Sequence, residues 1–224
     1  MIKNNIKVLN LYAGIGGNRK LWENVDVTAI EYKPEIAEIY QDFFPEDKVI
    51  VTDAHKYLLD NFEKFDFIWS SPPCPSHSRI RNVAGVGSGN VKPIYPDMKL
   101  YEEIIFLQQV YRSSGTNFNG KYVVENVKSY YEPLIKPVEL QRHYFWSNFF
   151  ISKRHFKTDS INKGNVKIWE EKLKVDLSKY DNINKDLVLK NCVNSELGYH
   201  IFSCAYPDNE ITVKDYYKQE EIFN

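Results

Sequence analysis

The sequence predicts an α/β fold whose sheet is mostly parallel and carries an antiparallel hairpin toward its C-terminal end. Between residues 6 and 127, short apolar runs typical of strands alternate with amphipathic segments typical of helices. This alternation favours parallel strands joined by right-handed crossovers. Glycines cluster after the first apolar run, and Pro72 and Pro73 end a later one, because proline cannot continue a central strand. The aromatic segment 138–151 is typical of two paired strands.

Length and composition set further bounds. The chain has 224 residues, 43% of them hydrophobic and 15% aromatic, which suits one domain with at most a small appendage. The net charge of −1 neither favours nor excludes a nucleic-acid partner, since a local basic face is enough to bind one. The three cysteines form no CxxC pair, so we expect neither a metal site nor a disulfide framework. Without a signal-peptide core or a membrane-length apolar run, we expect a soluble, cytoplasmic protein with no membrane partner.

The first expected strand, residues 6–12, leads into the glycine-rich turn 13–19, and we expect a helix to continue through Leu21 and Trp22. Glycine lets a backbone approach a ligand closely, so this turn is a candidate cofactor site. It is not the dinucleotide fingerprint, because Arg19 occupies the third glycine position.

The second expected strand, residues 25–31, ends in Glu31, followed by Tyr32. A carboxylate at this place in a nucleotide-binding unit commonly accepts hydrogen bonds from ribose hydroxyls, and Tyr32 is placed to face an adenine ring. The alternative for Glu31 is a solvated charge at a strand end. The next segment, 34–43, has a proline at an early position and an apolar face, which predicts a helix.

A short strand at 48–51 precedes Asp53 and a helix through Leu59. Asp53 is interpreted as the N-cap of that helix, as a ligand contact, or as both. The apolar run 65–69 then predicts a buried strand, and Cys74 follows it on a stiff, proline-rich loop. Parallel α/β sheets bind ligands at the carboxyl ends of their strands, where this loop lies, so Cys74 is a candidate nucleophile. The alternative is that Cys74 is a small buried hydrophobic residue in a tight turn.

Residues 79–96 contain few large apolar side chains and predict a lid over the thiol or, alternatively, a tolerated insertion. A helix is expected over 97–111 and a fifth strand over 121–127, with Glu125 and Asn126 near its tip. In the following hairpin, Arg142 stands among core-type residues and needs an anionic or carbonyl partner.

The chain divides into a core at residues 1–151, an insert at 152–187 and a C-terminal segment at 188–224 that returns to the core. Residues 152–174 hold seven basic and three acidic side chains. This local excess fits contact with a phosphate backbone, although a solvated lysine-rich surface is the alternative.

These groups together suit methylation at C5 of cytosine. That carbon is a poor nucleophile, and a thiolate that adds to C6 makes it reactive. The reaction also needs a carboxyl with a raised pKa at N3 and a group that holds O2. A glycine turn with an acidic ribose contact would bind the methyl donor.

Six motifs, in this order, resemble those of the C5-cytosine DNA methyltransferase family. They are residues 10–17, the Glu31–Tyr32 pair with Asp53, residues 71–78 around Cys74, Glu125-Asn126-Val127, Arg142, and Asn194-Ser195. The resemblance implies a Rossmann-like S-adenosylmethionine-dependent methyltransferase fold, S-adenosylmethionine as cofactor and double-stranded DNA as partner. It also implies that the target base flips out of the duplex into the pocket.

The resemblance assigns roles to individual residues. The catalytic residues are Cys74, Glu125 and Arg142. The cofactor contacts are Tyr12, Gly14, Gly16, Gly17, Glu31, Tyr32, Asp53, Asn194 and Ser195. The substrate contacts are Ser78, Arg79, Arg81 and Asn126.

The sequence departs from the family pattern in three places. Pro75 follows the cysteine where glutamine is frequent, and Leu140 stands where a second arginine is usual. The insert is much shorter than a typical target-recognition domain, so specificity is short, relaxed or supplied by a partner. The alternatives are a methyltransferase that acts on RNA, a non-catalytic nucleic-acid-binding protein with this fold and, disfavoured by Arg19, an NAD-dependent oxidoreductase.

Overall fold

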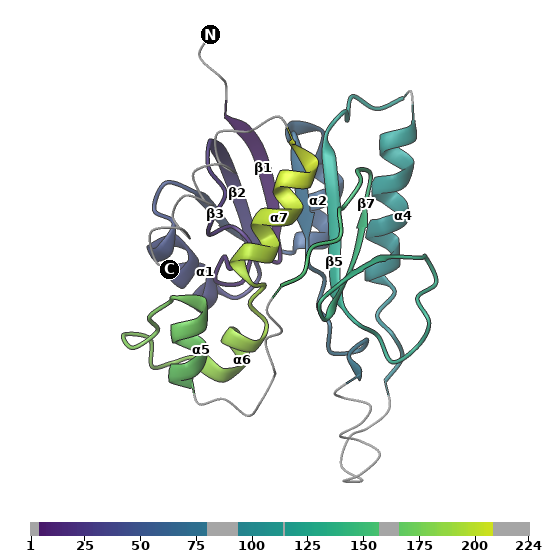
Figure 1. Cartoon of the computed structure of the whole chain (residues 1–224). Helices are drawn as coiled ribbons and strands as arrows, with labels where there is room; N and C mark the ends of the chain where they lie inside the picture. Colours follow the sequence, from purple (N-terminus) through teal and green to yellow (C-terminus); the bar gives the residue numbers. More distant parts are fainter. Residues whose placement is uncertain (1–4, 80–93, 114, 157–165, 208–224) are drawn as a thin grey trace.

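A single seven-stranded sheet organises the computed structural model, which describes residues 5–79, 94–113, 115–156 and 166–207. The strand order is β3-β2-β1-β4-β5-β7-β6 (Figure 1). The first five strands in the sequence are parallel, and β7 runs antiparallel to both β5 and β6. The strands are β1 (Ile6–Leu11), β2 (Val25–Glu31), β3 (Lys48–Val51), β4 (Phe67–Ser70), β5 (Lys121–Val127), β6 (Val138–Leu140) and β7 (His143–Ser147). The predicted α/β class, parallel sheet and antiparallel hairpin are confirmed.

Helices cover both faces of this sheet, because the strand residues alternate between them. Leu9 and Leu11 of β1 pack in one core cluster with residues of α2 (Ala54–Asn61) and α4 (Lys99–Arg112). Val8 packs on the opposite face with residues of α7 (Ser195–Ala205). α1 (Pro34–Phe43) packs beside α7 on that second face, over β2 and β3. A short 3-10 helix, η1 (Phe62–Lys64), precedes β4.

The segment after β1 consists of successive turns, so the helix expected through Trp22 is wrong. Its backbone bonds span three residues, from Gly16 to Ala13, from Arg19 to Gly16, and from Trp22 to Arg19. The φ angles of Tyr12, Gly14 and Gly16 are 55°, 54° and 79°, respectively. The positive φ angles keep the start of this segment out of a right-handed helix, and the three-residue turns continue to Trp22.

The C-terminal helix α7 closes the turn that the N-terminal residues form. Trp22 stacks on Phe202 of α7, with ring centroids 5.3 Å apart, and contacts Phe67 edge to face. Its Nε1 donates a hydrogen bond to the carbonyl oxygen of Gly198, at 3.2 Å. The first and last described parts of the chain therefore share one core.

The insert packs on the half of the sheet that carries the glycine turn. It contributes α5 (Val166–Leu173), and α6 (Lys185–Lys190) follows across its expected boundary. Trp169, Leu173 and Leu189 form one cluster with Ile15 of the glycine turn and Ile39 of α1. In Figure 1 both helices lie below α1. The expected domain boundaries and the recognition role of the insert stay predictions.

None of the helices in the described ranges is both long and apolar enough to cross a membrane.

Candidate active site

The predicted nucleophile and the predicted acid lie at neighbouring strands of the sheet. Cys74 follows β4, and Glu125 lies near the end of β5, which pairs with β4 in parallel. Asn126 joins the two, because its Nδ2 donates a hydrogen bond to the carbonyl oxygen of Pro72, at 2.9 Å. Asn126 is buried, and its Oδ1 accepts from the backbone of Val127. In the structure Asn126 therefore anchors the proline loop, and its expected contact with substrate stays a prediction.

The loop around Cys74 is tightly bonded. The carbonyl oxygen of Cys74 accepts from the backbone nitrogens of His77 (2.9 Å) and Ser78 (3.0 Å). Arg79 donates from Nε to the carbonyl oxygen of Ser129, at 2.7 Å, and Ser78 pairs with Ser129 as an isolated bridge. These contacts fix the loop against the segment after β5. Arg81 and most of the expected lid at 79–96 lie outside the described residues.

The thiol of Cys74 is half-buried, and its pKa is raised, which favours the neutral thiol over the thiolate. Burial and, next, the charge of Glu125 raise the pKa of the Cys74 thiol, while the charge of Arg142 lowers it. Burial disfavours a thiolate because water no longer solvates the charge. The resting thiol is therefore protonated at neutral pH, and Arg142 is the cation that favours its ionisation.

Glu125 has the pKa of a group that can donate or accept a proton near neutral pH. Its residue is 5% exposed, and burial raises the pKa of the Glu125 carboxyl to about 7, against smaller lowering effects of a hydrogen bond from Ser71 and the charge of Arg142. A carboxyl in this condition is matched to proton transfer at a base nitrogen.

His143 is a part of this site that the sequence did not reveal. Its Nε2 lies 3.6 Å from Oε1 of Glu125, and its Nδ1 has no hydrogen-bond partner among the described residues. Burial, followed by the charge of Arg142, lowers the pKa of the His143 imidazole to about 3, so the ring is neutral. The signal was its position as the first residue of the strand beside β5, but using that signal required the pairing of the two strands.

Arg142 lies close enough to act on its neighbours through its charge, which lowers the pKa of both Cys74 and Glu125. The hydrogen bond that it makes runs from Nη2 to the carbonyl oxygen of Lys190, at 3.3 Å. The expected carbonyl partner is therefore present, while its contact with a base stays a prediction.

The expected cofactor side is built around Glu31. Its two carboxylate oxygens accept from the backbone nitrogens of Gly14 and Lys33, both at 3.0 Å. A carboxylate has about four acceptor sites, so two remain for ribose hydroxyls. A Cβ on Gly14 would meet no described atom within 4 Å, so the turn borders open space, and Tyr32 beside it is 73% exposed.

Asp53 caps α2, as expected, by accepting from the backbone nitrogen of Lys56 at 3.0 Å. Tyr12 uses its hydroxyl inside the protein, because it donates to Oε1 of Glu103 at 2.6 Å. Glu103 also accepts from Ser70 of β4 and contacts Nδ1 of His55 at 2.9 Å, so one buried carboxylate joins four segments. The roles of Tyr12 and Asp53 toward a cofactor stay predictions.

The remaining expected cofactor residues meet at the start of α7. Asn194 caps this helix by accepting from the backbone nitrogens of Glu196 and Leu197. A Cβ on Gly17 would collide with Cys192 and Val193, so this glycine permits direct contact between the turn and the segment before α7. A Cβ on Gly16 would instead meet the ring of Phe44. Ser195 lies beside the turn, where it lines a cavity together with Gly16 and Gly17.

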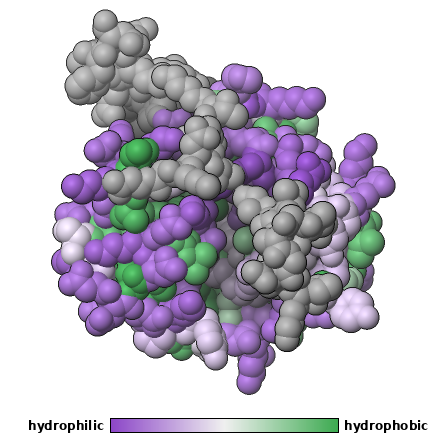
Figure 2. All heavy atoms as spheres, turned by 90° about the horizontal axis from the view of Figure 1, so that it is seen from below, coloured by the Kyte–Doolittle hydropathy of each residue, from purple (hydrophilic) through white to green (hydrophobic). Residues whose placement is uncertain are grey.

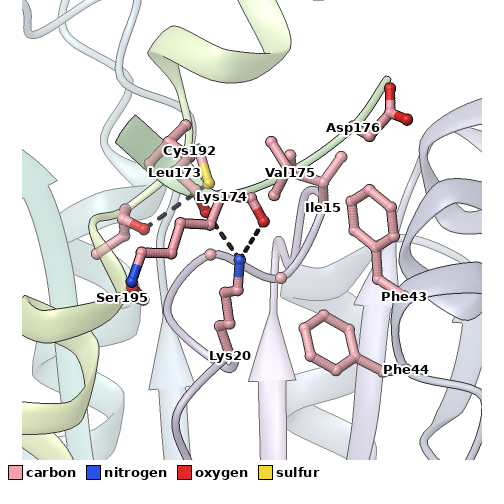
Figure 3. Close-up of a pocket in the computed structure, with 13 residues that line it drawn as sticks. Ile15, Lys20, Phe43, Phe44, Leu173, Lys174, Val175, Asp176, Cys192 and Ser195 are labelled. Atoms are coloured by element: carbon pink, nitrogen blue, oxygen red, sulfur yellow. Dashed lines mark hydrogen bonds between the residues drawn. The ribbon is translucent and has the colours of Figure 1, made fainter. Parts of the chain in front are cut away.

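That cavity, of about 360 Å³, lies between the glycine turn, α1 and the insert (Figure 3). Lys20 spans it and donates from Nζ to the carbonyl oxygens of Leu173 and Lys174, at 2.8 and 2.5 Å. Figure 2, seen from the end toward which β1 runs, shows hydrophobic residues gathered on the side where Figure 1 draws α5 and α6. The described residues that line the cavity do not include Cys74 or Glu31, so the cavity is separate from both of these side chains.

Comparison with known proteins agrees with these features. The model of the C-5 cytosine-specific DNA methylase family matches residues 6–105, which include the glycine turn, Glu31, Asp53 and Cys74. The predicted resemblance to this family is confirmed over that part of the chain. The sheet has the predicted architecture, with parallel strands and an antiparallel hairpin at one edge. No curated protein matches the chain.

Similar solved structures include three methyltransferases. A putative DNA modification methyltransferase from an Escherichia coli prophage is 16% identical, with a TM-score of 0.44, and the match covers 74% of this chain and 54% of that one. The Entamoeba histolytica methyltransferase EhMeth is 15% identical, with a TM-score of 0.43, over 75% of this chain and 60% of that one. A Spodoptera frugiperda DNMT2 mutant is 22% identical, with a TM-score of 0.35, over 55% and 36%. The chain thus spans about half the length of the prophage methyltransferase.

Proposed function

We propose that this protein, whose residues 6–105 match the C-5 cytosine-specific DNA methylase family, methylates C5 of cytosine in DNA with S-adenosylmethionine. The observation that carries the proposal is the pairing of two groups at one sheet edge. A cysteine follows β4 on a bonded loop, and β5 presents a buried carboxyl whose pKa is about 7. Nucleophilic addition to C6 and proton transfer at N3 require these two groups side by side.

The residues present fit the cofactor. Glu31 keeps two acceptor sites for ribose hydroxyls, Tyr32 exposes its ring, and Gly14 leaves the turn open on the side that a bound nucleoside would occupy. When bound, S-adenosylmethionine supplies an electrophilic methyl group. The residues of the chain then orient the nucleoside, exclude water and prepare the base.

In the proposed mechanism, the Cys74 thiol loses its proton to water, and the charge of Arg142 favours this ionisation. The thiolate forms a bond to C6 of a flipped-out cytosine, and the electron pair of the C5–C6 double bond moves toward C5. Glu125 donates its proton to N3, which keeps negative charge from building up on the ring. After the methyl group is in place, the C5 proton passes to water, the C6–S bond breaks to release the Cys74 thiolate, and the C5–C6 double bond is restored. N3 returns its proton to Glu125, and the thiolate is reprotonated by water.

The choice of DNA over RNA rests on the family match, since the shared thiolate chemistry works on either nucleic acid. The insert offers a small recognition surface, and RNA recognition relies on shape and single-stranded loops, so an RNA substrate is the second candidate. We also propose that a partner protein supplies sequence specificity. The insert is short for a target-recognition domain, and it packs on the half of the sheet that carries the glycine turn.

The test is methyl transfer from labelled S-adenosylmethionine to duplex DNA, single-stranded DNA and tRNA in parallel, with Cys74→Ser as the control. We expect label at cytosine C5 of duplex DNA, and at least a 100-fold slower reaction in the variant, because a hydroxyl is a far poorer nucleophile at neutral pH. The variant should still bind the cofactor. Label only in RNA would move the substrate and keep the mechanism, whereas full activity of Cys74→Ser would reject the assignment.

A further inference from the structure

Glu125 and His143 form a buried pair that the expected mechanism does not include. β5 and β7 are antiparallel, and Val127 lies opposite His143 in the register. Glu125 is two residues before Val127, so its side chain projects from the same face of the sheet as that of His143. The two side chains are 7% and 6% exposed, and Nε2 of His143 lies 3.6 Å from Oε1 of Glu125.

This contact is not an ion pair, because the imidazole is neutral. Burial and the adjacent guanidinium of Arg142 both disfavour its cationic form. The carboxyl of Glu125 therefore faces a neutral ring, and it is Nε2, not Nδ1, that is turned to it. Nδ1 is buried and has no hydrogen-bond partner among the described residues.

Among the described residues, Arg142 is the cation whose charge acts on the Glu125 carboxyl. From the loop after β4 come Ser71, which hydrogen-bonds to Glu125, and Cys74. From the turn before β7 comes Arg142, whose positive charge pulls the carboxyl toward ionisation. Cys192, in the segment before α7, is also close to Arg142, and burial raises the pKa of its thiol to about 12, so it stays neutral. A second cation at position 143 would increase the pull on Glu125.

We propose that His143 is the positioning residue of Glu125: a neutral imidazole that orients the carboxyl without adding positive charge. Held in this way, the carboxyl keeps a proton near neutral pH and presents it to N3 of the base. The inference rests on the proposed function for the identity of the proton acceptor. The pairing of the two side chains stands apart from it and can be tested without any substrate.

The first arm of the test measures the carboxyl itself. In the full chain labelled with ¹³C-glutamate, the Glu125 resonance is assigned by its loss in Glu125→Gln and is followed through a pH titration. His143→Gln keeps a neutral N–H donor and should leave the Glu125 midpoint in place. His143→Arg keeps a donor but adds charge, and should lower the midpoint by about one pH unit or more. Gln109→Arg, on the exposed face of α4, adds the same charge elsewhere and should change nothing.

The second arm follows the single-turnover rate of methyl transfer against pH. The wild-type rate should fall as Glu125 loses its proton, and in His143→Arg this fall should move to lower pH by the same shift as the titration. His143→Phe removes the ring nitrogen that faces the carboxyl at 3.6 Å, and should lower kcat by about 10-fold or more with little change in KM for DNA. His143→Gln should restore most of the lost rate.

The outcomes separate the two proposals. An unchanged Glu125 midpoint in His143→Arg, or a His143→Gln rate as low as that of His143→Phe, would overturn the positioning role even if the protein methylates DNA. Absence of methyl transfer to every nucleic acid, with the expected midpoint shift, would reject the proposed function and leave the pair intact. If His143→Phe fails to fold, the comparison of His143→Gln with His143→Arg still decides, because each keeps a polar side chain.

Discussion

Two glutamates are buried in the part of the chain that the structure describes, and their surroundings differ. Glu103, 1% exposed, contacts Tyr12, His55 and Ser70 through its two oxygens. Glu125, 5% exposed, has fewer polar partners, and burial therefore dominates its titration and brings its pKa to about 7. A carboxylate inside a protein stays charged only where donors replace water. The first glutamate therefore suits a structural task and the second a chemical one.

The raised pKa of Glu125 makes stability depend on pH. The folded protein holds this proton up to about pH 7, while the unfolded chain releases it near 4.5. The proton on Glu125 therefore contributes fully to the free energy of unfolding below the unfolded pKa, and this contribution is lost as the pH rises through the folded pKa. Glu125→Gln removes this loss and should be more stable than wild type at about pH 8.5, by up to roughly 3 kcal/mol.

Urea unfolding of both proteins between about pH 4.5 and pH 8.5 measures this difference. The opposite contribution of His143, whose pKa is lowered, is present in both proteins and cancels. A difference in the free energy of unfolding that stays constant across this range would show that Glu125 titrates normally.

A second prediction at this scale concerns Glu31, which accepts from the backbone of both Gly14 and Lys33. Glu31→Ala removes the ribose acceptors and should weaken S-adenosylmethionine binding by about 10-fold or more, equivalent to at least about 1.4 kcal/mol. Glu35→Ala, in the exposed first turn of α1, is the matched control. Calorimetric titration gives both affinities, and equal affinities in the two variants would remove Glu31 from the cofactor site.

At the scale of the elements, α4 joins β4, α2 and the residue that follows β1 through the contacts of Glu103. Its buried residues Leu100, Ile104 and Leu107 form the apolar face, and Glu103 occupies the same face. Through Glu103 the helix contacts the glycine turn at Tyr12. A shift of α4 would therefore be transmitted to the cofactor side.

The contact between His55 of α2 and Glu103 of α4 should make the stability of the protein depend on pH. The hydrogen bond to Glu103 raises the pKa of His55, against desolvation, and Glu102 adds to the effect. Because the pKa of His55 is raised in the folded protein, its protonated imidazole adds to the free energy of unfolding. This contribution is complete below the unfolded pKa of about 6.5 and is lost as the pH rises through the folded pKa. His55→Gln should therefore cost about 1 kcal/mol at about pH 5.5 and less at about pH 9.

Thermal unfolding of wild type and His55→Gln at both pH values checks this expectation, with Gln109→Ala on the exposed side of α4 as the control. Equal losses of stability at the two pH values would mean that the imidazole contributes only as a neutral hydrogen-bonding group.

The strands were predictable because buried parallel strands read as short apolar runs, and each run was ended by glycine, proline or a polar residue. The helix expected through Trp22 was wrong because successive three-residue turns replace it, and local composition does not distinguish such turns from a helix. Ile105 of α4 is 57% exposed, although its neighbour Ile104 is buried. Glu103 is three residues from Leu100 and four from Leu107, so helical spacing alone could have placed it in the core. His143 could not have been found in this way, because its contact with Glu125 depends on strand register.

At the scale of the whole molecule, the structure depends on contact between distant parts of the chain. A Cβ on Gly198 of α7 would collide with the backbone of Asn18, so the helix rests directly on the glycine turn. Asn18 is itself fixed, because its Nδ2 donates to Oδ1 of Asn10 at 2.8 Å. The cofactor side is therefore assembled from both ends of the described chain.

Replacement of Gly198 tests this assembly. Alanine favours an isolated helix over glycine by about 1 kcal/mol, so a neutral site would gain stability from Gly198→Ala. We expect a loss of about 2 kcal/mol or more instead, together with weaker S-adenosylmethionine binding, since the turn must move away from α7. Ser203→Ala on the same helix is the control. A Gly198→Ala protein with a higher melting temperature and normal binding would show that the contact is loose.

The stacking of Trp22 on Phe202 has a consequence for synthesis of the protein on the ribosome. Trp22 is translated before its packing partner Phe202, which follows it by 180 residues. A nascent chain therefore carries an open turn and an exposed indole ring until α7 has left the exit tunnel. The packing of Trp22 is therefore completed only after α7 has been synthesised.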